Sequence, residues 1–119
     1  MIYPQEIEVW YLLPAIRREI SKSLVKNGLT QKNIALRLGI TGSAVSQYLK
    51  EKRASEIKFD DNTLGAIERS SKKIAKNENV MKEIEKIIHL MKKTKFICKI
   101  HHKYDHSLPE HCDNCIYEK

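Results

Sequence analysis

The sequence contains few of the residues that mark secreted, membrane-spanning or RNA-reading proteins. Of its 119 residues only 7% are aromatic and three are cysteine. A small, odd number of cysteines does not predict a disulfide framework, so we expect free thiols or metal ligands. The longest apolar run, 9–16, contains Pro14 and is too short to cross a bilayer. With no signal-peptide pattern at Met1, these absences predict a cytoplasmic protein that does not enter a membrane.

Positive charge is in excess, and it is unevenly distributed. The formal net charge is +7, from 22 Lys and Arg against 15 Asp and Glu. Residues 31–59 hold six basic and two acidic side chains, a balance of +4, whereas 1–30, 60–93 and 94–119 have balances of +1, +2 and zero. Such a concentration is the electrostatic footprint of a phosphate-binding surface. The alternative is a solvated basic face without a partner.

Apolar side chains recur at intervals of three and four residues near the start of the chain. They are Val9, Leu13, Ile16, Ile20 and Leu24. This spacing predicts helices over about 4–12 and 14–26, with Pro14 kinking or splitting the run. We expect Trp10 and Tyr11 to pack against the core, with a dimer contact as the alternative.

Two further helices are predicted in the second half of the chain. One covers about 62–76 and follows the capping candidates Asp60, Asp61 and Asn62. The other covers 80–93, is amphipathic, and either faces the core or forms a dimer interface. We therefore expect an all-α fold, a small helical bundle.

The stretch 31–49 predicts two short helices joined at a glycine. Thr30 precedes the first helix as a cap, and Gly39 follows it where a left-handed residue usually ends a helix. Thr41 is a second capping candidate, and Val45 lies on the inner face of the second helix. A helical hairpin inside a bundle is the structural alternative.

The outer face of the second short helix is small, polar and basic. Ser43, Ser46 and Gln47 could read base edges in a major groove, and Ala44 could touch a thymine methyl. Phosphate contacts are expected from basic side chains at the end of this helix and beyond it. The full predicted DNA-binding set is Gln31, Thr41, Ser43, Ala44, Ser46, Gln47, Lys50, Lys52 and Arg53.

The stretch resembles the helix-turn-helix of the phage-repressor-like (XRE-type) transcription regulators. The matching positions are Gln31, Ala35, Gly39, Ile40 and Val45. The wider layout, through 6–20 and 98–115, is similar to a group of archaeal predicted regulators with a cysteine-bearing tail. The resemblance implies a regulator that binds double-stranded DNA. Because such regulators usually read two half-sites, it also implies a homodimer.

The segment 96–119 carries a second chemical signal. Cys98 and His101 form one pair with two residues between them, and Cys112 and Cys115 form another. Three cysteines and one histidine suit a closed tetrahedral zinc site. An iron–sulfur cluster and a loose tail with spare thiols are the alternatives. The segment lacks helical periodicity in its apolar residues, so we expect a metal to supply the folding energy of this tail.

Together these features predict three segments and one leading function. We expect residues 1–60 to form a helix-turn-helix domain with an N-terminal helix, 61–94 to form a helical segment with dimerisation as its candidate role, and 95–119 to form a Cys/His metal-binding tail. The leading hypothesis is a sequence-specific, non-enzymatic transcription regulator whose tail is a structural clip or a sensor. A structural or RNA-binding module, or a metal-dependent nuclease, is the alternative; RNA readers usually present more aromatic side chains.

Overall fold

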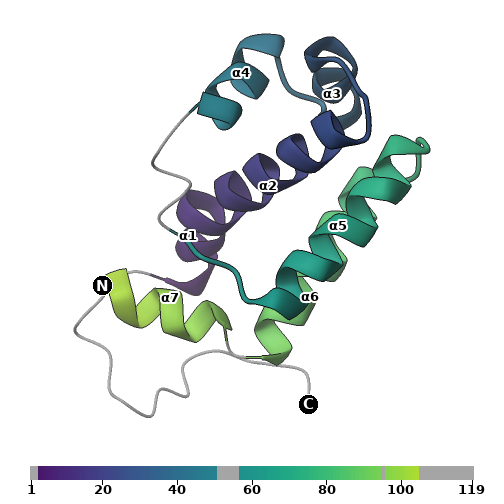
Figure 1. The fold of residues 1–119 in the computed structure, drawn as a ribbon. Helices are drawn as coiled ribbons and strands as arrows, with labels where there is room; N and C mark the ends of the chain where they lie inside the picture. The colour runs from purple at the N-terminus through teal and green to yellow at the C-terminus, as the bar shows by residue number, and fades with distance from the viewer. Residues whose placement is uncertain (1–2, 51–56, 95, 105–119) are drawn as a thin grey trace.

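The computed structural model describes residues 3–50, 57–94 and 96–104, and every regular element within these ranges is helical (Figure 1). The predicted all-helical fold is confirmed for this part of the chain. No helix in the same ranges is long and apolar enough to span a bilayer. The predictions for Lys52, Arg53, Cys112 and Cys115 fall outside the described residues.

The N-terminal helical run is continuous, which corrects the prediction of two helices separated at Pro14. It consists of α1 (Pro4–Ile7), the π-helical segment η1 (Glu8–Leu12) and α2 (Leu13–Lys26). The backbone N–H of Leu13 donates to the carbonyl oxygen of Glu8, five residues earlier. A wider turn at this point shifts the preceding carbonyls relative to the Pro14 ring, so the helix passes the proline without breaking.

Two short helices follow α2 with the predicted termini. α3 spans Gln31–Leu38, and the Thr30 side chain accepts a hydrogen bond from the Asn33 N–H at 3.2 Å. Gly39 ends α3 in the left-handed region with φ 67°. α4 spans Gly42–Lys50, and the Thr41 hydroxyl oxygen accepts from the Ala44 N–H at 3.0 Å. Both capping predictions are therefore confirmed.

The remaining helices form a hairpin and a final short element. α5 spans Asp61–Ala75, and its cap is Asp60, whose Oδ1 accepts from the Thr63 N–H at 2.7 Å. α6 spans Val80–Lys93, as predicted. α7 spans Phe96–Tyr104, which corrects the expectation that this segment lacks helical structure. Its residues Ile97 and Ile100 are buried three positions apart, so α7 packs one apolar face against the core.

α2 lies at the centre of the molecule. α3, α4 and α5 all pack against it, α6 lies against α5, and α7 contacts both α1 and α6. α3 and α4 therefore occupy one end of the molecule and α7 the other (Figure 1). The buried side chains of this core include Ile7, Leu12, Ile16, Ile20, Leu24, Ile34, Val45, Ile67, Ile74, Ile87, Met91 and Ile97.

Trp10 lies outside this core, contrary to the prediction. Trp10, on η1, is 55% exposed, whereas its neighbour Tyr11 packs partly against the core. The prediction of core packing is therefore wrong for Trp10. The segment is helical on both sides of Trp10, but the neighbouring helices cover only the side that carries Ile7 and Leu12.

Candidate nucleic-acid interface

α4 is anchored on one side and open on the other. Val45 is fully buried against the core, and Tyr48 and Leu49 are half-buried. On the opposite side Ser43, Gln47 and Lys50 are exposed. The predicted base-reading residues Ala44 and Ser46 flank this open side and are half-buried. α4 therefore presents a polar strip of hydrogen-bonding side chains to solvent, held in place by an apolar inner face.

The turn before α4 fixes how this strip is presented. The N–H groups of Gly39 and Ile40 both donate to the carbonyl oxygen of Ala35, the latter at 3.0 Å. Ala35 is buried where α3 meets α4, and Ile40 packs partly against the core. The angle between the two helices is thus set by a left-handed residue and a buried apolar corner.

Two further predicted contact residues stand at helix N-termini. Gln31 is the first residue of α3, and its side chain is exposed. Thr41 is exposed as well, and because its Oγ1 already accepts from the Ala44 N–H, its hydroxyl hydrogen is left to donate elsewhere. With exposed Lys50 at the end of α4, they add polar and cationic groups to the surface of the two helices.

Two of the four predicted metal ligands lie among the described residues, and Cys112 and Cys115 lie outside them. Cys98 and His101 both lie on α7, three residues apart and so on neighbouring positions of one helix face. Cys98 is half-buried, and His101 is only 2% exposed. The described part of the chain gathers no group of three or more His, Cys, Asp or Glu side chains able to hold a metal ion.

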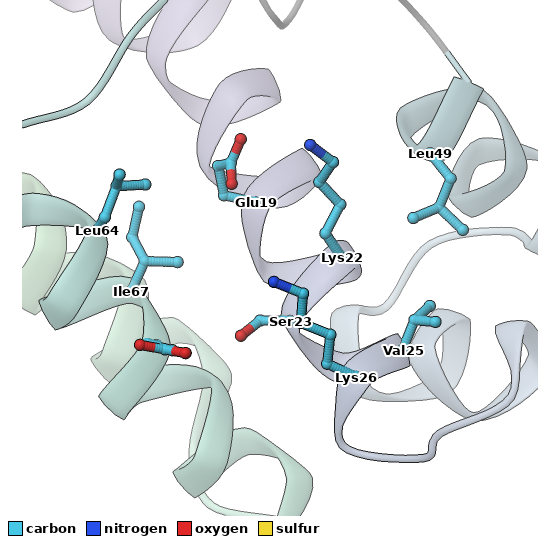
Figure 2. Close-up of a pocket in the computed structure, with 9 residues that line it drawn as sticks. Glu19, Lys22, Ser23, Val25, Lys26, Leu49, Leu64 and Ile67 are labelled. Atoms are coloured by element: carbon cyan, nitrogen blue, oxygen red, sulfur yellow. The ribbon is translucent and has the colours of Figure 1, made fainter. Parts of the chain in front are cut away.

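The structure also contains a groove that the sequence did not predict. It lies between α4 and α5 with α2 as its floor, and has a volume of about 630 Å³ (Figure 2). Its lining residues are Glu19, Lys22, Ser23, Val25, Lys26, Leu49, Leu64, Ile67 and Glu68. The only sequence signal is that Val25 and Leu64 are apolar residues at the edges of their helical stripes. They are 45% and 40% exposed.

A second feature missed from sequence is a buried carboxylate in the α5–α6 hairpin. Glu83 is 4% exposed; its Oε2 accepts from the Lys86 ammonium at 3.0 Å, and its Oε1 lies 4.0 Å from Lys73 Nζ. Burial alone raises the pKa of this carboxyl. The hydrogen bond and charge of Lys86, the charge of Lys73 and a hydrogen bond from Ser70 outweigh burial, so the pKa lies below its usual value.

No protein-family model, curated protein or solved structure matches this chain. The geometry of the described helices and the chemistry of their side chains therefore carry the functional argument.

Proposed function

We propose that this protein is a sequence-specific DNA-binding transcription regulator in which α3 and α4 act as a helix-turn-helix. The observation that carries the proposal is the open strip of α4, which combines Ser43, Gln47 and Lys50 on a helix anchored by Val45. An α-helix is about 10–12 Å wide, so one with short polar side chains on its open side fits the major groove of B-DNA.

Different residues have different roles in this proposal. Ser43, Ser46 and Gln47 read base edges, with the Gln47 amide suited to a bidentate contact with adenine. Ala44, half-buried beside them, meets a thymine methyl at the margin of the contact. Gln31 and Thr41 position the pair of helices on the backbone, and Lys50, Lys52 and Arg53 hold phosphates. A homodimer binding two half-sites one helical turn apart completes the proposal.

We also propose that Cys98 and His101 supply two ligands of a metal site, with Cys112 and Cys115 as the other two. Their spacing along α7 allows both side chains to reach one ion. Zinc is the first candidate and an iron–sulfur cluster the second. About one zinc per chain in protein purified without oxygen would support a structural clip, and iron, sulfide and visible absorption would support a cluster.

The DNA-binding proposal is tested by selection from randomised duplexes with the full-length protein, followed by competition with random duplex DNA. We expect an enriched, two-fold symmetric site. Gln47→Ala should reduce discrimination against random DNA about tenfold, because one bidentate base contact contributes about 1–3 kcal/mol. Affinity for random DNA should stay nearly unchanged.

The control is Lys93→Ala, which changes an exposed charge at the end of α6, far from α4. It should alter neither property. Equal losses on selected and random DNA for Gln47→Ala would remove Gln47 from the reading role. Preferential binding of single-stranded RNA would favour the RNA-binding alternative, and DNA cleavage abolished by a chelator would favour the nuclease.

A further inference from the structure

The groove between α2, α4 and α5 combines apolar walls with two lysines on its floor. Leu49 from α4 faces Leu64 and Ile67 from α5 across α2, as Figure 2 shows. Val25 extends the apolar surface on the α4 side. A site of this volume, about 630 Å³, lies within the usual range of about 300–1,000 Å³ for small-molecule sites.

The groove is lined by two lysines and two glutamates, but one of the glutamates is neutralised by an arginine outside the lining. Lys22 and Lys26 are one helical turn apart on α2, both are exposed, and neither has an ion-pair partner among the described residues. Glu19 is already paired with Arg18, at 3.2 Å between Oε1 and Nη1. Glu68 on α5 is the remaining carboxylate that lines the groove. Two ammonium groups against one uncommitted carboxylate leave a net positive site.

We propose that this groove binds an amphipathic organic anion, a single carboxylic acid with a long apolar body. The carboxylate would pair with Lys22 and Lys26, and the apolar body would cover Leu49, Leu64 and Val25. Covering the solvent-accessible parts of these apolar side chains favours binding, and the two ammonium groups select the charge of the head group. A neutral or cationic amphiphile of the same length lacks the attraction between its head group and the two ammonium groups.

The position of the groove gives such a ligand a route to α4. Leu49 belongs to the last full turn of α4, and Val45, one turn earlier, is fully buried beneath the same helix. A ligand that contacts Leu49 on one side and Leu64 on the other binds best at one spacing of α4 and α5. It therefore biases the placement of α4. This second step rests on the proposed DNA-binding function; ligand binding itself does not.

The test is a titration of full-length, methyl-labelled protein with dodecanoate, monitored by NMR. We expect saturable shifts at the methyl groups of Val25, Leu49, Leu64 and Ile67. Dodecyltrimethylammonium, with the same chain and the opposite charge, should bind at least about tenfold more weakly, and acetate should give no saturable shift. Saturation confined to the groove is the expected result.

Variants identify the residues responsible. Lys22→Ala combined with Lys26→Ala should weaken dodecanoate about tenfold or more, and Leu64→Trp, which fills the groove, should abolish binding. Lys82→Ala, an exposed lysine on α6 outside the groove, should leave the affinity unchanged. Circular dichroism of each variant confirms that the helices persist, which is expected because Lys22, Lys26 and Leu64 are all exposed.

Three outcomes would overturn the proposal. One is the absence of saturable shifts. Another is shifts that spread equally to the methyl groups of other exposed apolar residues such as Val9 and Met81, which would indicate detergent-like association. The third is equal affinity for both head groups. Effects on DNA are measured separately. If dodecanoate binds but does not change the affinity for the selected duplex, the ligand site stands and only its proposed coupling to α4 is wrong.

Discussion

At the scale of single residues, Gly39 tests how much the turn before α4 depends on its backbone conformation. Its φ of 67° is left-handed, and a Cβ placed there would meet no atom within 4 Å. Gly39→Ala should therefore lower the free energy of unfolding by about 1 kcal/mol through backbone strain alone. Urea denaturation measures the loss.

The matched control is Gly42→Ala, at the first position of α4. A Cβ on Gly42 also meets open space, and its φ is not in the left-handed region. Alanine there should stabilise the protein by about 0.4–1 kcal/mol, because it restricts the unfolded chain without straining the native one. The opposite signs separate backbone strain from steric crowding; equal effects would contradict the role assigned to φ.

Ser21 offers a second test at this scale, in the opposite direction. Its side chain is fully buried on α2, and Oγ has no hydrogen-bond partner in the described structure. Ser21→Ala should raise the free energy of unfolding by about 1 kcal/mol, because an unsatisfied buried hydroxyl is costly and alanine favours the helix. Thermal and urea unfolding measure the gain.

Ser71 is the matched comparison, since it is equally buried but satisfied. Its hydroxyl donates to the Ile67 carbonyl oxygen at 2.7 Å. Ser71→Ala loses that bond and gains only helix propensity, so it should be less stable than Ser21→Ala by roughly 1 kcal/mol. If both serines respond alike, the Ser21 hydroxyl has a partner such as an ordered water.

At the scale of whole elements, the α5–α6 hairpin depends on the ionised carboxylate of Glu83. The pKa of Glu83 is lowered from 4.5 in the fold, so its contribution to stability is fully present above about pH 4.5. That contribution is lost as the pH falls through the lower folded-state pKa. Glu83→Gln should cost about 1–3 kcal/mol at pH 7, because Lys86 and Lys73 lose their buried partner.

Denaturation of both proteins between pH 7 and pH 2 isolates this residue, since all other carboxyl groups titrate in each. The stability difference between wild type and Glu83→Gln should shrink on acidification. Glu85→Gln, two positions along α6 and exposed, should change the stability at pH 7 only slightly. A difference for Glu83→Gln that stays constant to low pH would show that the carboxylate acts by shape alone.

Elements could be predicted from sequence where local signals agreed. Thr30, Gly39 and Asp60 each place a helix end by side-chain or backbone chemistry within a few residues, and the structure has those ends. The helix α7 was not predicted, because the cysteine and histidines of this segment suggested metal ligands. α7 buries Ile97 and Ile100 and packs on α6, which directly precedes it, and on α1, which is distant in sequence.

The prediction of a break at Pro14 was wrong for a related reason. Proline predicts a kink or a break from its own geometry, but the π-helical turn of η1 accommodates it, and packing of Leu12 and Ile16 holds the run together. The groove could not be predicted from the sequence, although Val25 and Leu64 stand at the edges of their apolar stripes. It exists because α4 and α5 stand apart over α2, and no periodicity within a single helix encodes that spacing.

At the scale of the whole molecule, α3 and α4 lie at one end, and α7 with the end of α6 lies at the other (Figure 1). Both ends carry lysines, Lys32 and Lys50 at the first and Lys93, Lys99 and Lys103 at the second, so the position of a charge can be tested apart from its amount. If the proposed DNA-binding face is correct, binding to random duplex DNA should weaken steeply with salt, because each phosphate contact releases counterions. The slope of log affinity against log salt counts those contacts.

Removing one cation from each end should therefore have unequal effects. Lys50→Ala should reduce the magnitude of that slope by about 0.9 and weaken selected and random DNA alike, as expected for loss of one phosphate contact. Lys93→Ala removes the same charge from the distant end of α6 and should leave the slope unchanged, although the net charge of both variants is equal. Titrations over about 50–200 mM salt distinguish the two. Equal changes in slope would mean that DNA binding depends on the overall charge of the molecule, and that α4 is not the surface that contacts DNA.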